Sequence, residues 1–123
     1  MTKQEQLEII NKYNPMLDDY HVGIREISDI KTFKEAVDEA MNDYKEYGSY
    51  SSYPDITNKI IEDSLSTGKI KIYSSYPIIP GVFVTPSKMQ ANEYAGGEKI
   101  YSKLSDIDDI AWINVDEGMY TKI

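Results

Sequence analysis

The chain has no cysteine, and among its 123 residues it has one histidine and one arginine. Without cysteine it can form neither disulfides nor thiolate metal sites, and it has no thiol nucleophile. The single histidine, His21, would leave a zinc site to be built from carboxylates, which structural zinc sites seldom use. We therefore expect no metal centre.

Long hydrophobic runs are also lacking. No apolar run approaches the roughly 18 residues that a membrane-spanning helix needs, and the first ten residues, MTKQEQLEII, are too polar for a secretion signal. We expect a cytoplasmic protein that makes no membrane contact. With 41% hydrophobic and 28% charged residues, the composition is that of a folded globular protein. The length fits one domain, residues 1–123, which buries about two thirds of the surface of the unfolded chain.

Positive charge is scarce, since the formal net charge is −8 and Arg25 is the one arginine among thirteen basic residues. A protein that follows a phosphate backbone needs a cluster of basic side chains, so we expect no direct nucleic-acid binding. An acidic surface can instead repel a nucleic acid or imitate one. The eleven tyrosines fit either the edges of a core or a surface that contacts another protein.

Periodic apolar residues predict that the first part of the chain, residues 1–67, is helical. A capping-box pattern near the N-terminus predicts a helix over residues 2–13, ended by Asn14-Pro15. Apolar residues at steps of three and four predict the longest helix, over residues 29–46. Between these helices, residues 20–25 fit either a short strand or an ordered loop.

A third helix is expected after a polar loop at residues 48–55. Asp55 is predicted to cap it, and Gly68 to end it by adopting a left-handed conformation. Four apolar residues are predicted to face inward from this helix: Ile56, Ile60, Ile61 and Leu65.

From Lys69 onward the apolar period changes to two, which indicates a half-buried strand. Further strands are predicted over residues 82–84, 99–103, 110–115 and 119–123, with Trp112 in a core position and a turn at residues 116–118. Helices followed by strands are typical of an α+β fold, with residues 68–123 as its strand-rich part.

One helix interrupts the strands, in the stretch GVFVTPSKMQANEYAGG at residues 81–97. Thr85 is predicted to cap this helix, Pro86 to occupy its first position, and Gly96-Gly97 to end it. Its inward face is predicted to consist of Met89, Tyr94 and either Ala91 or Ala95.

Asp116-Glu117 is the local candidate for chemistry. A carboxylate on a turn beside a rigid sheet can orient or deprotonate a ligand hydroxyl. The alternative is a turn whose carboxylates face solvent and do nothing further.

The order of several short motifs gives these carboxylates a context. The motifs are Tyr73-Ser74-Ser75, then Phe83-Val84-Thr85-Pro86-Ser87, then Ala91 with Tyr94-Ala95, then an apolar strand and Asp116-Glu117. This order resembles the mono-ADP-ribosyltransferase superfamily, and in particular the compact domains carried by bacteriophage and mobile-element proteins. The resemblance covers residues 68–123 and leaves the N-terminal helices unassigned. It implies a split pair of small, mainly antiparallel sheets that clamp NAD.

The resemblance also implies roles for individual residues. Glu117 would be the catalytic glutamate, which binds the nicotinamide ribose and supports a cation-like transition state. Phe83, Thr85 and Ser87 would hold the nicotinamide-ribose region, next to Tyr73 on the first strand. A strand that ends in hydroxyl residues at a helix start offers both side-chain oxygens and free amides.

One position departs from the superfamily pattern. Where an arginine or histidine usually follows the aromatic residue of the first strand, this chain has Ser74. A hydroxyl does not replace a forked cation on a pyrophosphate. Arg25 and His21 are the candidates for that role from the N-terminal part.

Two functions follow from these expectations. The first is a phage or mobile-element ADP-ribosyltransferase that modifies a host protein with NAD in the host cytoplasm. The alternative is a catalytically inactive, small acidic protein that inhibits a host factor such as a defence nuclease, as an anti-defence or anti-CRISPR protein that mimics nucleic acid. A third hypothesis is that the chain is an accessory component of a larger phage particle. The sequence does not distinguish this hypothesis from the second.

Overall fold

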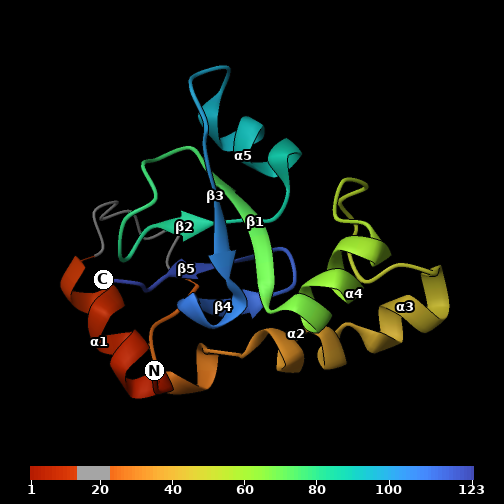
Figure 1. Ribbon diagram of the computed structural model, residues 1–123, viewed down its shortest axis with the longest axis horizontal. Helices are drawn as coiled ribbons and strands as arrows, with labels where there is room; N and C mark the ends of the chain where they lie inside the picture. Colours follow the sequence, from red (N-terminus) through yellow and green to blue (C-terminus); the bar gives the residue numbers. More distant parts are fainter. Residues whose placement is uncertain (14–22) are drawn as a thin grey trace.

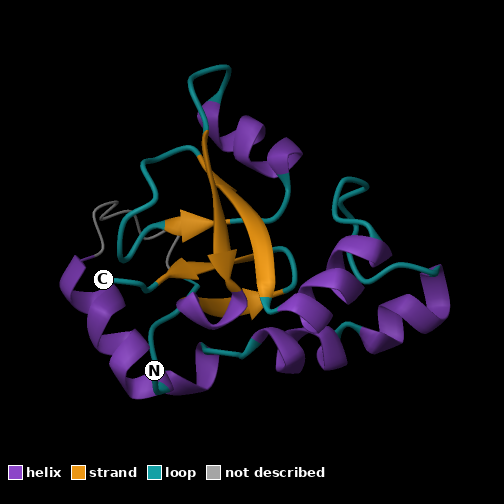
Figure 2. Ribbon diagram, viewed as in Figure 1, coloured by secondary structure: helices purple, strands orange, loops and turns teal. Residues whose placement is uncertain are grey.

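The computed structural model describes residues 1–13 and 23–123, and this part is a mixed α+β structure, as predicted (Figure 1 and Figure 2). Its helices are α1 (Lys3–Tyr13), α2 (Phe33–Glu39), α3 (Met41–Tyr47), α4 (Asn58–Thr67) and α5 (Lys88–Ala95). Its strands are β1 (Lys69–Ser74), β2 (Phe83–Val84), β3 (Tyr101–Asp106), β4 (Ile110–Asn114) and β5 (Glu117–Tyr120). Two short 3-10 helices, η2 (Ile27–Asp29) and η3 (Ile107–Asp109), precede α2 and β4. No helix within these two described ranges is long and apolar enough to cross a bilayer.

The strands form two small antiparallel sheets. One is the β1–β3 ribbon, and the other has the order β2–β5–β4. The ribbon crosses the three-stranded sheet in Figure 1. The two sheets join at an isolated bridge, where the Tyr73 amide donates to the Thr85 carbonyl at 2.7 Å and the Thr85 amide donates to the Tyr73 carbonyl at 3.0 Å. The end of β1 is therefore fixed directly beside the residue that follows β2.

The three-stranded sheet is buried on both faces. On one face Trp112 is fully buried, as predicted, and packs against Phe33 of α2 with ring centroids 4.9 Å apart. On the other face Ile10 of α1 packs with Phe83 and Met119. Because strand side chains alternate between faces, the near-continuous apolar run in β4 is accounted for by two separate clusters.

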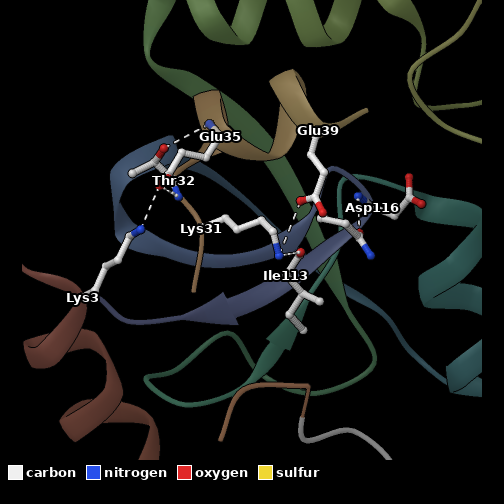
Figure 3. Close-up of polar contacts among 8 residues, drawn as sticks. Lys3, Lys31, Thr32, Glu35, Glu39, Ile113 and Asp116 are labelled. Atoms are coloured by element: carbon white, nitrogen blue, oxygen red, sulfur yellow. Dashed lines mark hydrogen bonds and ion pairs between the residues drawn. The ribbon is translucent and has the colours of Figure 1, made fainter. Parts of the chain in front are cut away.

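The segment before α2 attaches the helices to β4. Lys31 forms an isolated bridge with Trp112, through backbone hydrogen bonds of 2.8 and 3.1 Å. Its ammonium donates to the Ile113 carbonyl at 3.1 Å and lies 3.5 Å from a Glu39 carboxylate oxygen (Figure 3). Residues from both the helical and the strand-rich parts thus contribute to one hydrophobic cluster.

The helix predicted over residues 29–46 is wrong in its start and in its continuity. It begins at Phe33, because the Thr32 hydroxyl accepts from the Glu35 amide at 3.1 Å and the Glu35 carboxylate accepts from the Thr32 amide at 3.0 Å. This capping box marks a helix start that the prediction placed inside the helix. The helix is then interrupted at Ala40, which ends α2 and precedes α3. Of the segment predicted at 20–25, residues 20–22 lie outside the described part, and residues 23–25 form no strand.

Asp55 does not cap α4, contrary to the prediction. Thr57 is the cap, and its side chain accepts from the Ile60 amide at 3.2 Å. Gly68 ends the helix with φ +73°, as predicted. Of the four residues expected to face inward, Ile56 and Ile61 are buried, whereas Ile60 and Leu65 are 37% and 36% exposed.

The start of α5 is also two residues later than predicted. Ser87 is the cap, and its hydroxyl accepts from the Gln90 amide at 3.0 Å, so Pro86 precedes the helix. Thr85 is still part of the sheet bridge, which keeps it extended. The stop at Gly96 is confirmed by its φ of +58°. On the predicted inward face Ala91 and Ala95 are buried, but Met89 and Tyr94 are exposed.

The last strands are shifted from their predicted positions. β3 covers residues 101–106 instead of 99–103, and β5 covers residues 117–120 instead of 119–123. The turn between β4 and β5 lies at residues 115–116, where the Asp116 amide donates to the Asn114 side chain at 2.8 Å. Glu117 is consequently the first residue of a strand and pairs with Asn114, rather than standing in a loop.

Candidate functional site

The candidate site is built around the buried turn between β2 and α5. Every residue from 81 to 87 is buried. The Thr85 hydroxyl accepts from the Ser87 amide at 3.0 Å, which closes the turn locally. The two hydroxyl residues that the sequence predicts for cofactor binding therefore lie inside the protein, with exposures of 1% for Thr85 and 0% for Ser87.

A chain of side-chain hydrogen bonds links this turn to Glu117. The Thr85 hydroxyl donates to the Gln90 side-chain oxygen at 2.7 Å. The Gln90 amide nitrogen then donates to a Glu117 carboxylate oxygen at 3.3 Å. Gln90 is buried and Glu117 is half-buried. The carboxylate is thus oriented by a side chain that is itself held from behind, which is the arrangement that fixes a charged group for use.

Asp55 holds the other end of the turn from a distant part of the sequence. Its two carboxylate oxygens accept from the Ser87 hydroxyl at 2.8 Å and from the Met89 amide at 3.0 Å, 32 and 34 positions away in the chain. An anionic acceptor is favourable at a helix N-terminus. The residue predicted to cap α4 therefore stabilises the start of α5 instead.

Ser74 occupies the position where the resemblance leads one to expect a cation. It is buried, its hydroxyl donates to the Phe83 carbonyl at 2.8 Å, and it accepts from the Tyr76 amide at 3.1 Å. Ser74 thus ties the end of β1 to β2. A long charged side chain at this position would point into packed protein.

The surroundings of Glu117 are acidic and aromatic. Burial raises the pKa of the Tyr53 hydroxyl, and the nearby charges of Glu93, Asp116 and Glu117 raise it further. Burial also raises the pKa of Asp116, against the opposing effect of a hydrogen bond donated by the Ser51 hydroxyl. A region with this many carboxylates favours a ligand that carries or develops positive charge.

The structure brings together part of the predicted site. Thr85, Ser87 and Glu117 belong to one hydrogen-bonded network, and Phe83 pairs with Met119 of the same strand as Glu117. Phe83 also packs edge-on against the Tyr94 ring, with centroids 5.3 Å apart. Tyr73 reaches the network through its backbone bridge to Thr85.

Of the two predicted phosphate ligands, Arg25 is not part of this network. Arg25 is exposed, and its backbone amide donates to Asp29 at 2.9 Å. That hydrogen bond, together with a second from the Glu26 amide, lowers the pKa of Asp29. His21 lies outside the described residues. Within the described ranges, no three carboxylate or histidine side chains are grouped to hold a metal ion.

A cavity of about 590 Å³ lies on another side of the turn. Among the described residues predicted to bind the cofactor, Tyr73 alone lines it. Its other lining residues come from α4, β1, α5, the Leu104 position of β3 and the residues next to these elements. The cavity is therefore separate from the carboxylate of Glu117.

The sequence reasoning missed three contributors, namely Gln90, Asp55 and Gly118. For Gln90 a signal was present, because Ser87-x-x-Gln90 has the capping-box spacing. Gly118 is required by space, since a Cβ there would lie 2.7 Å from the Ala111 carbonyl oxygen and 2.7 Å from an Ile110 methyl carbon. The role of Asp55 depends on a long-range contact that no local pattern encodes.

Comparison of the chain with protein-family models, with curated proteins and with solved structures finds no match.

Proposed function

We propose that this chain is an ADP-ribosyltransferase-like protein of the compact phage or mobile-element type, which binds NAD and modifies a host protein. The observation that carries the proposal is the coupling of Glu117 to the Thr85 turn through Gln90, beside the junction of two small antiparallel sheets. In a transfer of this class, a fixed carboxylate stabilises the positive charge that develops on a ribose. Glu117 is half-buried and oriented, and it is suited to that task.

In this proposal the chain contacts NAD at its nicotinamide-ribose end. Phe83 and Glu117 would hold the nicotinamide ribose, while Thr85 and Ser87, whose hydroxyls are committed to Gln90 and Asp55, would position the turn. When bound, NAD supplies an activated bond between the ribose and nicotinamide. The basic side chain that usually binds the phosphates in this superfamily has no counterpart at Ser74, because Ser74 is buried and links two strands.

Thermal unfolding with and without NAD tests the proposal. A ligand at 100 times its Kd adds about 2.7 kcal/mol to the free energy of unfolding, so the melting temperature should rise with NAD concentration. Glu117→Gln keeps an oxygen that accepts from Gln90 and removes the charge. We expect this variant to bind NAD but to lose transfer of labelled ADP-ribose to protein. Neither stabilisation nor labelling with the unaltered chain would contradict the proposal.

A second candidate is a catalytically inactive acidic protein that occupies a host factor such as a defence nuclease. The buried Ser74 favours this candidate, because the first-strand motif, which the structure describes, has a serine where a phosphate-binding basic residue would stand. Here Glu117→Gln should leave partner binding unchanged, and binding should weaken with salt. A partner complex that requires Glu117 with the fold intact would argue against simple occupancy.

A further inference from the structure

The outer face of the β1–β3 ribbon is the floor of a groove with helical walls. Strand side chains alternate, so Lys69, Lys71 and Tyr73 share the face opposite the buried Ile70 and Ile72. α4 and α5 both pack against β1, and Figure 1 shows them near its two ends. Together these elements enclose about 590 Å³, which we call the lysine groove. The groove is lined by Asp55, Ile60, Asp63, Ser64, Lys69, Ile70, Lys71, Tyr73, Pro86, Lys88, Met89, Asn92 and Leu104.

Three large apolar side chains meet in the lysine groove without being buried. Ile60 of α4, Met89 of α5 and Leu104 of β3 are 37%, 45% and 66% exposed. Single exposed apolar residues are ordinary, whereas these three come from three separate elements and line one hollow. Ile60 and Met89 were predicted from helical periodicity to face inward, and they instead face the lysine groove.

The positive charge of the groove is only partly neutralised. Lys69 pairs with Asp106. Two aspartates also line the groove: Asp55 accepts from the neutral Ser87 hydroxyl and Met89 amide and so keeps its charge, and Asp63 pairs with Lys59 at 2.7 Å.

Lys71 and Lys88 both line the groove, and among residues 1–13 and 23–123 neither forms an ion pair with a carboxylate. The Lys71 ammonium lies 5.6 Å from the Tyr73 ring centroid. With three lysines and two aspartates in its lining, the groove has a formal charge of +1 beside apolar surface, whereas the whole chain has a net charge of −8.

We propose that the lysine groove binds an acidic segment of a partner protein that presents both apolar side chains and carboxylates to it. Apolar side chains would cover Ile60, Met89 and Leu104, and carboxylates would pair with Lys71 and Lys88. The proposal does not depend on NAD binding, since Glu117 lies outside the groove.

Two labelled peptides of equal length, with leucine at the same positions, test this proposal; one has glutamate and the other lysine at the remaining charged positions. Titrated into the ¹⁵N-labelled protein, the acidic peptide should shift the amide resonances of β1, α4 and α5. Its affinity should fall as salt rises, because exposed charges are screened. The basic peptide should leave these resonances in place.

Variants then assign the binding to the groove. The double reversal Lys71→Glu with Lys88→Glu should weaken the acidic peptide by about tenfold, a change worth about 1.4 kcal/mol. Leu104→Asp should weaken it as well. Leu65→Asp is the matched control, because Leu65 is an exposed leucine of α4 that does not line the groove. Circular dichroism establishes that each variant is folded.

Three results would overturn the proposal. The first is equal binding of the acidic and basic peptides, and the second is a groove that responds to ADP but not to the acidic peptide. The third is sedimentation that shows self-association abolished by Leu104→Asp, since the occupant would then be a second copy of the chain. Peptide binding that tracks the two lysines and Leu104, with Leu65→Asp unchanged, supports it.

Discussion

Removal of the Asp55 carboxylate is the sharpest test of how the site is held together. Asp55 lies between α3 and α4, yet both its oxygens accept hydrogen bonds at the start of α5, from the Ser87 hydroxyl and the Met89 amide. α5 in turn carries Gln90, which orients Glu117. The change Asp55→Ala therefore removes an anchor whose effects reach the candidate catalytic carboxylate.

The expected cost follows from the two bonds. Ser87 is fully buried, and a buried hydroxyl that loses its partner costs about 1–3 kcal/mol. The Met89 amide belongs to the first turn of α5, where loss of a capping acceptor costs about 1 kcal/mol. We expect Asp55→Ala to lower the free energy of unfolding by about 2–4 kcal/mol. Asp55→Asn, which keeps one acceptor oxygen, should cost about half as much.

Urea unfolding of the three proteins measures these differences. The urea concentration at the midpoint should fall in the order unaltered chain, Asp55→Asn, Asp55→Ala. The slope of the free energy of unfolding against urea concentration should stay constant, since the surface exposed on unfolding is unchanged. Lys59→Ala, which removes an exposed ion pair on α4, is the control and should change stability by less than about 0.5 kcal/mol. An Asp55→Ala protein as stable as this control would refute the anchoring role.

Three further predictions concern other parts of the fold. Gly118→Ala should destabilise the protein by about 1–3 kcal/mol in urea unfolding, because its Cβ would meet the Ala111 backbone; unchanged stability would show that the sheet yields there. Burial raises the pKa of Asp116 above its ordinary 3.8, so the ionised carboxylate lowers the free energy of unfolding. Asp116→Asn should therefore stabilise the protein at pH 7, and this added stability should vanish as pH falls below 3.8. Added stability that does not depend on pH would contradict the raised pKa. Hydrogen bonds from the Thr32 amide and from Lys3 lower the pKa of Glu35 from 4.5 to about 2 (Figure 3). The ionised carboxylate therefore stabilises the fold above pH 4.5, and this contribution is lost as pH falls towards 2. In thermal unfolding, Glu35→Gln should be less stable than the unaltered chain at pH 7, and the difference should shrink between pH 4.5 and pH 2.

Local patterns in the sequence predicted the elements better than their ends. The alternation in β1 and the glycine stops at Gly68 and Gly96 depend on neighbouring residues, and the structure confirms them. The start of α5 was wrong because Thr85 is held extended by a bridge to Tyr73, a contact between distant parts of the chain. Intrinsic preference decides such positions only when no tertiary contact opposes it.

The candidate site was predictable in its residue types and not in its connections. The sequence pointed to Thr85, Ser87 and Glu117, and the structure links all three. The capping-box spacing of Ser87 and Gln90 marks the helix start, but it does not indicate that the Gln90 side chain connects Thr85 to Glu117, because that link is a contact between distant parts of the chain. The burial of Ser74 follows from its hydrogen bond to the Phe83 carbonyl, which requires the two sheets to meet.

Helix α5 relates the two proposed binding regions, because opposite parts of its first turn serve each of them. Gln90 is directed towards Glu117, whereas Lys88 and Met89 line the lysine groove. A change that loosens α5 as a whole, such as Asp55→Ala, should weaken both NAD binding and acidic-peptide binding. Leu104→Asp should affect only the peptide, and Glu117→Gln should affect only ADP-ribose transfer. If Leu104→Asp also reduced NAD binding without loss of structure, the groove and the Glu117 region would be parts of one site, and their separate assignment would be wrong.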